Sequence, residues 1–233
     1  MENKRTIMAI GGHIGDMELT AGATLATMAL QGHKIITVAL TAGERGNPPH
    51  LTDKEYRVQK VDEANKFAQM LNGEAIVLEY ADGELPDNKE VRLQVCDLIR
   101  KYKPNVLITH WSKSMHKDHA TTHRIVNDAQ FFAGLPALER ENKAHFAAGP
   151  YYAENWEDPT DFNPYIYSVI TDEGYNLWQE AINHHWFALN SKSFKYKDYY
   201  SNLKQVRGIE ARRTYAECFE IDPIQKRVIR EGI

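Results

Sequence analysis

The chain has 233 residues and a mass of 26.7 kDa, enough for one substantial hydrophobic core, so we expect a single domain over residues 1–233. Its 42% hydrophobic and 26% charged residues are ordinary for a globular protein. The net charge of −4 gives no electrostatic case for nucleic acid or acidic membranes as partners. No apolar run approaches the roughly 20 residues that span a bilayer, and the first residues lack a signal peptide's apolar segment. Because Cys96 and Cys218 form no disulfide framework or metal motif, the sequence predicts a reducing cytoplasm.

Short apolar runs alternate with amphipathic stretches along the first 134 residues. We expect strands at Thr6–Ile10, Ile35–Leu40, Ala75–Leu78 and Asn105–Thr109, and helices at Asp16–Gln31, Lys54–Leu71, Val91–Tyr102 and His119–Phe132. This pattern predicts an α/β, Rossmann-like fold with a mostly parallel sheet flanked by helices. Beyond Gly134 the pattern weakens to a smaller C-terminal β/α extension. It holds the aromatic-rich segments Pro150–Asn155 and Pro164–Ile170 and helices within Glu173–Asn190 and Lys195–Tyr215.

Histidine and aspartate residues gather after the first and the fourth expected strand. His13 and Asp16 follow the first, and His116 and His119 follow the fourth. Ligands of parallel sheets bind outside the carboxyl ends of the strands, so both groups should meet on one rim. Zinc in a hydrolytic site usually takes three His, Asp or Glu ligands and leaves a fourth position open for water. The sequence therefore predicts a metal site on this rim.

Taken alone, each of these residues also has a structural explanation. Asp16 is a common type of helix N-cap, and backbone groups can satisfy a loop histidine such as His13. The glycines at positions 12 and 15 would suit a dinucleotide-binding loop, but the full Gly-x-Gly-x-x-Gly is absent. His119 and His123 lie one turn apart, as in metalloproteases, without the Glu that acts as their base. Together on one rim, these residue types favour a metal.

Five segments of the chain resemble the zinc-dependent de-N-acetylases of the PIG-L/LmbE family, which remove acetyl groups from N-acetylglucosamine conjugates. They are the His-x-x-Asp opening at residues 13–16, the loop Thr41–Gly46, the turn Asp82-Gly83, the signature His116–His119 and the segment Tyr215–Phe219. The opening continues with Glu18 and Gly22, which resemble the branch that acts on glucosaminyl malate. These segments occur in the family's order along nearly the whole chain.

The resemblance implies roles for the matching residues. His13, Asp16 and His119 would bind zinc or another divalent transition metal. His116 would polarise the amide carbonyl or protonate the leaving amine, and Asp118 would orient a histidine.

Substrate contacts are implied as well. In the family, a substrate-binding Arg stands three residues before a helical Glu; here Lys60 precedes Glu63 at that spacing, and Arg57 lies nearly one turn earlier. An ammonium is a point charge and cannot make the two-pronged contact of an arginine. We expect Arg57, Lys60 and Asp82 to bind the substrate.

Gly15 departs from the family pattern. The family signature is His-Pro-Asp-Asp or His-Ala-Asp-Asp, and its first Asp acts as general base, whereas position 15 here has no side chain. A positioned acid–base group contributes about 10²–10⁴-fold in rate. Glu18 or Glu44 would have to supply a substitute carboxylate, and we take Glu18 as the catalytic candidate beside His116 and Asp118. A Gly15→Asp substitution is expected to raise deacetylation strongly if only the base is missing.

The sequence thus predicts a metal-dependent hydrolase that removes an acetyl or other acyl group from an N-acetylglucosamine-type conjugate, with zinc-bound water as nucleophile. Its activity would be reduced or altered because Gly15 replaces the base. The alternative is an inactive relative that binds metal and a carbohydrate or metabolite. A dinucleotide-binding oxidoreductase would instead bind nicotinamide and be indifferent to chelators. From the resemblance we also expect a homo-oligomer, a trimer or a hexamer.

Overall fold

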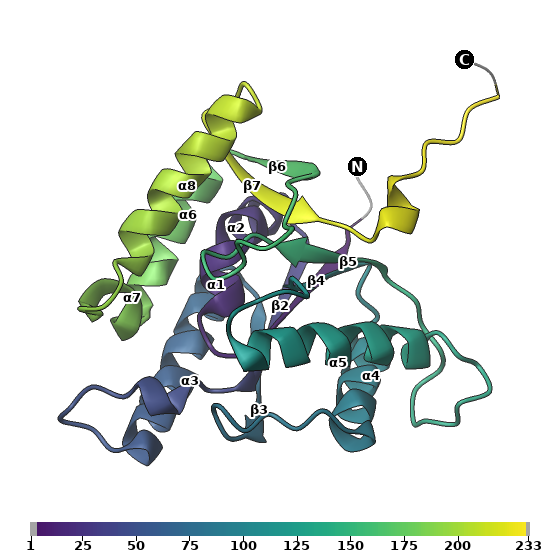
Figure 1. The fold of residues 1–233 in the computed structure, drawn as a ribbon, viewed down its shortest axis with the longest axis horizontal. Helices are drawn as coiled ribbons and strands as arrows, with labels where there is room; N and C mark the ends of the chain where they lie inside the picture. The colour runs from purple at the N-terminus through teal and green to yellow at the C-terminus, as the bar shows by residue number, and fades with distance from the viewer. Residues whose placement is uncertain (1–3, 232–233) are drawn as a thin grey trace.

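The computed structural model describes residues 4–231, in which a seven-stranded sheet has helices packed on both of its faces (Figure 1). The strands are β1 (Thr6–Gly11), β2 (Lys34–Thr41), β3 (Glu74–Tyr80), β4 (Val106–His110), β5 (Ala148–Ala153), β6 (Ile166–Ile170) and β7 (Tyr215–Glu220). The α-helices are α1 (Asp16–Thr20), α2 (Gly22–Leu30), α3 (Asp53–Met70), α4 (Lys89–Tyr102), α5 (Lys117–Ala133), α6 (Asp172–Ala181), α7 (Trp186–Asn190) and α8 (Tyr196–Glu210). Short 3₁₀ turns are η1 (Glu44–Gly46), η2 (Ile182–His184) and η3 (Pro223–Lys226).

The strand order β3-β2-β1-β4-β5-β7-β6 confirms the expected α/β fold. Strands β1 to β5 are parallel, whereas β7 runs antiparallel to both β5 and β6. The chain first builds the sheet from β1 towards β3 and then continues on the other side of β1 with β4. Where the strand order reverses, between β1 and β4, the connections diverge and leave a crevice in which such folds bind ligands.

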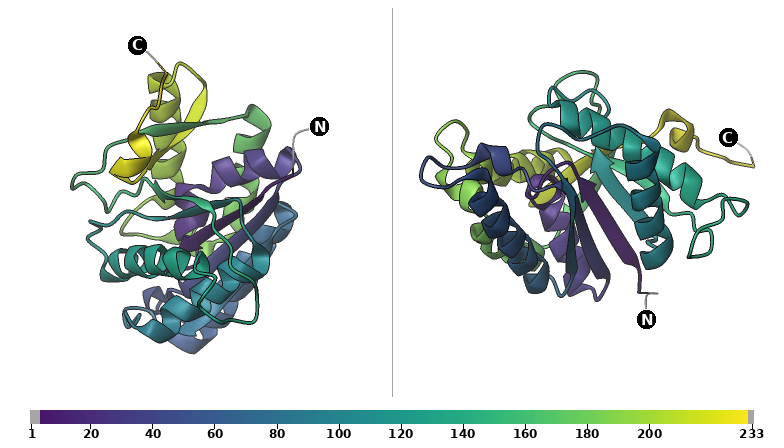
Figure 2. Two further views of the ribbon diagram at one scale, coloured as in Figure 1. Left: turned by 90° about the vertical axis from the view of Figure 1, so that its right-hand side faces the viewer. Right: turned by 90° about the horizontal axis from the view of Figure 1, so that it is seen from below.

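Side chains of β1 alternate between two separate cores. Ile7 and Ala9 pack in the cluster that includes residues of α2, α6 and α8, while Met8 and Ile10 pack with α4 and α5. All four are fully buried, which explains why this strand is a continuous apolar run in the sequence. The two side views show the helices on either side of the sheet (Figure 2). Within residues 4–231, no helix has both the length and the apolar character needed to cross a membrane.

The structure divides two of the expected helical stretches and shows where the helix within a third one ends. The stretch Asp16–Gln31 is not one helix, because it breaks at Ala21 into α1 and α2. The expected helix within Lys195–Tyr215 ends at Glu210, since the chain turns back and Tyr215 begins β7. Gly208 permits this turn: a Cβ there would lie 2.3 Å from the carbonyl oxygen of Thr214. The stretch Glu173–Asn190 is divided among α6, η2 and α7.

Candidate metal centre and pocket

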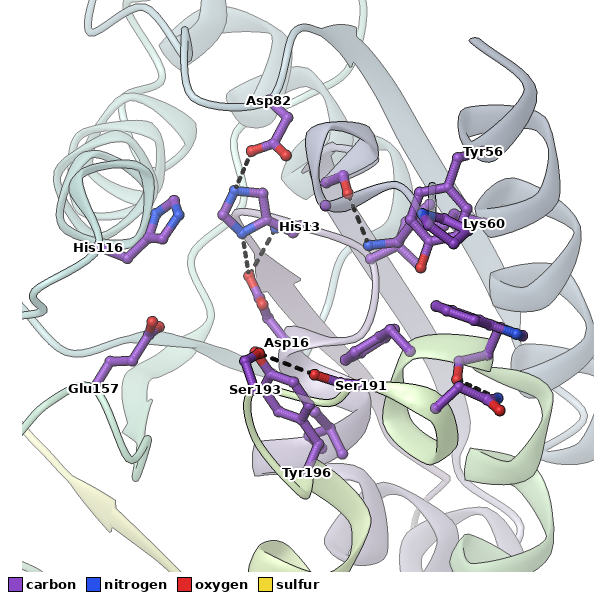
Figure 3. A pocket seen from close by; sticks show the side chains of 18 of the residues that line it. His13, Asp16, Tyr56, Lys60, Asp82, His116, Glu157, Ser191, Ser193 and Tyr196 are labelled. Atoms are coloured by element: carbon purple, nitrogen blue, oxygen red, sulfur yellow. Dashed lines mark hydrogen bonds and ion pairs between the residues drawn. The ribbon is translucent and has the colours of Figure 1, made fainter. Parts of the chain in front are cut away.

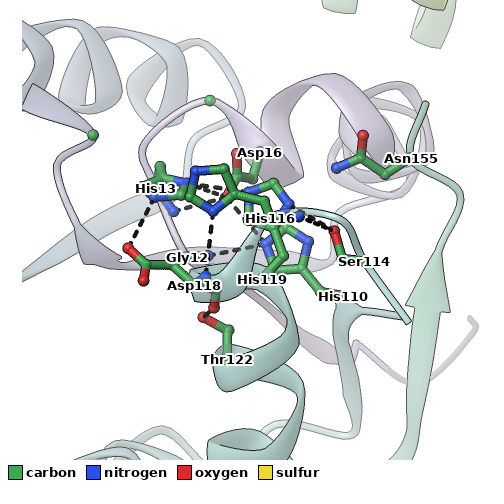
Figure 4. Close-up of polar contacts among 12 residues, drawn as sticks. Gly12, His13, Asp16, His110, Ser114, His116, Asp118, His119, Thr122 and Asn155 are labelled. Carbon is green, nitrogen blue, oxygen red and sulfur yellow. Dashed lines mark hydrogen bonds and ion pairs between the residues drawn. The ribbon is translucent and has the colours of Figure 1, made fainter. Parts of the chain in front are cut away.

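The candidate metal ligands lie at the carboxyl ends of β1 and β4, on the same rim of the sheet. His13 follows β1 and Asp16 begins α1, while His110 ends β4 and His119 lies in the first turn of α5. His116 is the N-cap residue of α5. Figure 4 shows these side chains converging from the two loops. The fold therefore brings together residues that are about a hundred positions apart in the sequence.

Three ligand atoms form a nearly equilateral triangle. The Nδ1 atom of His13 lies 3.3 Å from Oδ2 of Asp16 and 3.1 Å from Nε2 of His119. The same Asp16 oxygen lies 3.2 Å from Nε2 of His119. Two atoms bound to a tetrahedral zinc at about 2.0–2.1 Å are separated by about 3.3 Å. The triangle therefore has the dimensions of one face of a zinc coordination tetrahedron.

The second nitrogen of each of these histidines faces a carboxylate. His13 Nε2 lies 3.1 Å from Oδ1 of Asp82 and 3.4 Å from Oδ2 of Asp118. His119 Nδ1 lies 3.2 Å from Oε2 of Glu157. A carboxylate in this position holds a metal-binding histidine in one tautomer and orientation. The donor set thus fits a divalent transition metal at His13, Asp16 and His119.

The same cluster contains three overlapping triplets whose ligand atoms lie within 4.8 Å of one another: His13 with His116 and His119, Asp16 with His110 and His119, and His13 with Asp82 and Asp118. We favour His13, Asp16 and His119 because this set leaves the outer nitrogen of both histidines facing a carboxylate.

The Asp16 carboxylate shifts the pKa of the histidines around it, and they shift its own pKa. Burial alone would lower the pKa of His119, but Asp16 and Glu157 raise it to about 9. Burial would likewise raise the pKa of Asp16, yet His119 and His13 hold it well below its usual value. His110 stacks on His119 with ring centroids 4.0 Å apart, and burial together with that neighbour lowers the pKa of His110 to about 4. A divalent cation would take the place of the imidazolium protons that Asp16 attracts.

His116 and Asp118 occupy distinct places in the cluster. Nδ1 of His116 accepts a hydrogen bond from the backbone N–H of Asp118 at 3.3 Å, so its ring proton belongs on Nε2. Burial and the neighbouring His119 lower the pKa of His116, which favours the neutral ring. The Asp118 carboxylate accepts from the N–H of Gly83 at 2.7 Å and lies against His13, the orienting position that the motif implied.

The candidate ligands line a cavity of about 750 Å³ that also has an aromatic wall (Figure 3). The wall consists of aromatic side chains from α3, α7, α8 and the loop after β5: Tyr56, Trp156, Trp186, Phe187, Tyr196 and Tyr200. Trp186 packs edge-on against Tyr56, with ring centroids 6.3 Å apart. Most of this wall comes from the C-terminal region, where the sequence pattern was weakest.

Lys60 and Asp82, two of the expected substrate-binding residues, line this cavity. Lys60 is 5% exposed, and its Nζ donates to the Gly43 carbonyl oxygen at 3.3 Å and lies 5.0 Å from the Phe187 ring centroid. Among residues 4–231, no carboxylate forms an ion pair with it. Both oxygens of Asp82 are engaged, one by His13 and the other by the backbone N–H of Arg45 at 3.0 Å. The Lys60 ammonium is therefore more available than the Asp82 carboxylate to contact a ligand.

The third expected substrate-binding residue, Arg57, does not line the cavity. Its guanidinium donates to the Leu78 carbonyl oxygen and to Glu79, both at 2.9 Å, and lies 3.7 Å from Glu44. Glu44 is also outside the cavity lining, where it accepts from the backbone N–H of Asp82 at 2.9 Å. Arg57 thus connects α3 to β3 and η1, and Glu44 connects η1 to the turn after β3.

Glu18 is likewise outside the cavity lining. Its carboxylate accepts from the backbone N–H of Gly15 at 3.0 Å, which caps the start of α1, and burial raises its pKa to about 7. Gly15 has φ +105°, and a Cβ added there would lie 2.3 Å from Cζ of Phe187. The Phe187 ring therefore occupies the space that a side chain at position 15 would need. An aspartate at position 15 would have to displace that ring and adopt a strained backbone conformation before it could act as a base.

Sequence reasoning missed Glu157 as a site residue. It follows β5, lines the cavity and contacts His119. Among residues 4–231, its Oε1 atom has no hydrogen bond, unlike the two engaged oxygens of Asp82. Treating the aromatic run Pro150–Asn155 as a fifth parallel strand would have found it, because that strand's carboxyl end faces the same rim.

Comparison with known proteins identifies the family of this chain. Residues 8–130 match the family model described as PIG-L: GlcNAc-PI de-N-acetylase. The chain is 27% identical over 143 residues to the diacetylchitobiose deacetylase of Thermococcus kodakarensis, a match that covers 59% of this chain and 54% of the relative. It thus spans about half of that relative's length. It is 23% identical over 224 residues to the 4-oxalmesaconate hydratase of Pseudomonas putida, covering 90% and 82% of the two chains.

Among solved structures, the 4-carboxy-2-hydroxymuconate hydratase of Pseudomonas putida superposes with a TM-score of 0.84 at 19% identity and covers 98% of this chain and 99% of that one. At this identity the likeness concerns the fold alone. The family match covers more than half of the chain and includes all three corners of the metal triangle. The protein is therefore a member of the PIG-L de-N-acetylase family.

Proposed function

We propose that this protein is a metal-dependent hydrolase that removes the acetyl or another acyl group from an N-acetylglucosamine-type conjugate. The observation that carries this proposal is the triangle of His13, Asp16 and His119, whose 3.1–3.3 Å sides suit zinc. Family membership and the deacetylase relative support it. A divalent ion held by these residues would act as a Lewis acid towards water and an acyl oxygen.

His116 is the proposed electrophilic residue. Its Nδ1 is occupied by the Asp118 backbone N–H, so the Nε2–H is the group left to donate to the acyl oxygen. As that oxygen gains negative charge in the transition state, a donor already in place strengthens its contact without reorganisation. The lowered pKa of His116 keeps the ring neutral near neutral pH.

Glu157 is the proposed substitute for the missing base. Of the carboxylates that line the cavity, Asp16 belongs to the metal triangle and Asp82 has both oxygens engaged. Glu157 also lines the cavity, and it uses one oxygen for His119 while the other has no hydrogen bond among residues 4–231. It would accept the proton of the attacking water and pass it to the leaving amine.

The cavity suits a conjugate larger than one sugar ring. Its volume of about 750 Å³ lies within the range of small-molecule sites. The aromatic wall offers flat apolar faces for sugar rings, and Asn155 and Ser191 add polar groups.

A second candidate function is the hydration of a carbon–carbon double bond in a small polycarboxylate. Two observations in the structure favour it. Position 15 carries no carboxylate and its space is filled by Phe187, while hydration has no leaving amine to protonate. Lys60 presents a buried ammonium without an ion-pair partner among residues 4–231, and a substrate carboxylate would offset its desolvation. The hydratase relative covers most of both chains.

One experiment separates the candidates. Metal-free protein is reloaded with zinc, cobalt or manganese and given N,N′-diacetylchitobiose, with free amine measured, and separately an unsaturated tricarboxylate, with loss of ultraviolet absorbance measured. The proposal predicts metal-dependent amine release that falls about 10²–10⁴-fold in Glu157→Gln. Absorbance loss alone would replace it with the hydratase. Metal binding without either reaction would leave a non-catalytic relative that binds metal and a carbohydrate or metabolite.

A further inference from the structure

The break between α1 and α2 lies within a single helical stretch of the sequence. Ala21 has φ −127° and ψ 0°, far from helical values, and neither Gly nor Pro stands at that position. Helical hydrogen bonds resume around it, since Ala21 N–H donates to the Met17 carbonyl oxygen and Leu25 N–H donates to that of Ala21. Gly22, the next residue, permits a break here because glycine has a low helix propensity, but it supplies no partner for the backbone groups that the break releases.

Side chains from the C-terminal region take the carbonyl groups at the end of α1. In a continuous helix the carbonyl oxygens of Glu18 and Leu19 would accept from N–H groups four residues on. Instead Glu18 accepts from the indole N–H of Trp178 at 2.7 Å, and Leu19 accepts from Nζ of Lys204 at 2.9 Å. Trp178 belongs to α6 and Lys204 to α8.

Glu217 binds two N–H groups in the first turn of α2. Its two carboxylate oxygens accept from the backbone N–H of Ala23 at 3.1 Å and of Thr24 at 2.8 Å. Lys204 Nζ lies 3.0 Å from the same carboxylate and 3.8 Å from the Trp178 ring centroid. All three side chains are at most 4% exposed. Together they bind two carbonyl oxygens at the end of α1 and two N–H groups at the start of α2.

We propose that Trp178, Lys204 and Glu217 are positioning residues for the metal site, an inference that rests on the metal-binding role proposed above. By holding the break open, they set the direction of α1, whose first residue is Asp16. Because α1 has only five residues, the break lies little more than one turn from the Asp16 carboxylate. Figure 1 shows α6 and α8 beside α1 and α2.

The Tyr215–Phe219 segment, which contributes nothing to the cavity lining, acquires a role through Glu217. Glu217 lies at the centre of β7, between Ala216 and Cys218, and is buried against α2. A carboxylate in a buried strand is costly unless it is paired and hydrogen-bonded. Here all of its partners belong to the α1–α2 break or to Lys204.

The test compares Glu217→Gln and Lys204→Met with a matched control, Glu154→Gln. The control breaks another ion pair of α8, with Arg207, that does not touch α1. Cobalt affinity is measured by chelator competition, and the visible spectrum of bound cobalt reports its coordination geometry. We expect about tenfold weaker cobalt binding or more and a changed spectrum in the two variants, and wild-type values in the control.

The same variants are compared without metal, by the chemical shifts of the His13 amide and the His119 ring. These groups contact Asp16 directly, so a shifted Asp16 moves their signals whether or not the protein binds metal. Trp178→Phe, which removes the indole donor and keeps an aromatic ring, serves if the charge variants fail to fold. Lower melting temperatures with wild-type cobalt affinity, spectra and shifts would overturn the inference. If the wild type bound no metal, the proposed function would fail, while the metal-free shifts would still decide whether the three residues position Asp16.

Discussion

The parallel half of the molecule, β1 to β4 with α1 to α5, and the C-terminal region, β5 to β7 with α6 to α8, contribute to the site in different ways. The first supplies all three corners of the metal triangle. The second supplies Glu157, most of the aromatic wall and the three side chains that hold α1 and α2 apart. Metal ligands come as short local motifs at strand ends, whereas the surroundings that tune them are assembled from distant segments.

The substitution Asp16→Ala tests most directly whether the parallel half supplies the metal ligands. We expect about one zinc per wild-type chain and almost none in the variant, because the triangle loses its only carboxylate. Elemental analysis after zinc loading and gel filtration measures this, with Glu154→Gln as a control in the C-terminal region. A wild-type protein that takes up no metal would contradict the assignment of ligands to the parallel half.

The second largest effect is expected at the contact between the two regions, where Phe187 lies beside Gly15. Gly15→Asp should lower the free energy of unfolding by about 3 kcal/mol, since the Cβ clashes with Phe187 and the positive φ strains an L-residue. Urea unfolding measures it, and Gly46→Asp is the control, because a Cβ there meets nothing within 4 Å. Adding Phe187→Ala should recover part of the loss; strictly additive effects would show that the ring does not fill that space.

His185, in the C-terminal region, should make stability depend on pH. Burial lowers its pKa to about 3, with help from Lys60 and His184. Below pH about 6.5 the His185 side chain binds a proton in the unfolded chain but not in the folded protein. Its contribution to the free energy of unfolding therefore falls by about 1.4 kcal/mol per pH unit between pH 6 and 4. His185→Leu should flatten that slope, and the exposed His184→Leu should not. Equal slopes in all three proteins would contradict the buried neutral ring.

The smallest expected effect is a difference in KM between substitutions of two cationic residues of α3. Lys60→Ala should raise KM about tenfold, because Lys60 lines the cavity. Arg57→Ala should change KM less than about threefold, because an exposed ion pair is worth little and its guanidinium faces Glu79. Steady-state kinetics measures both, with whichever of the two test substrates the protein converts, and a larger effect at Arg57 would place the substrate outside the described cavity.

The sequence alone determined the parallel core and the gathering of candidate metal ligands at its rim, for a physical reason. Hydrophobic periodicity and short motifs are local, and the carboxyl ends of parallel strands share one rim, so His13, Asp16 and His119 were predictable as neighbours. Limits of the strands and helices there differ from expectation by only one or two residues, apart from the break at Ala21.

Tertiary structure alone decided what surrounds those ligands. Phe187 fills the space beside Gly15, and Glu217 receives the N–H groups of α2, although about 170 or more residues separate the partners in each case. Glu18 has the residue type of a catalytic base, yet its carboxylate caps α1 behind the cavity. Which buried polar group meets which partner depends on packing between distant elements, and that information is absent from any local pattern.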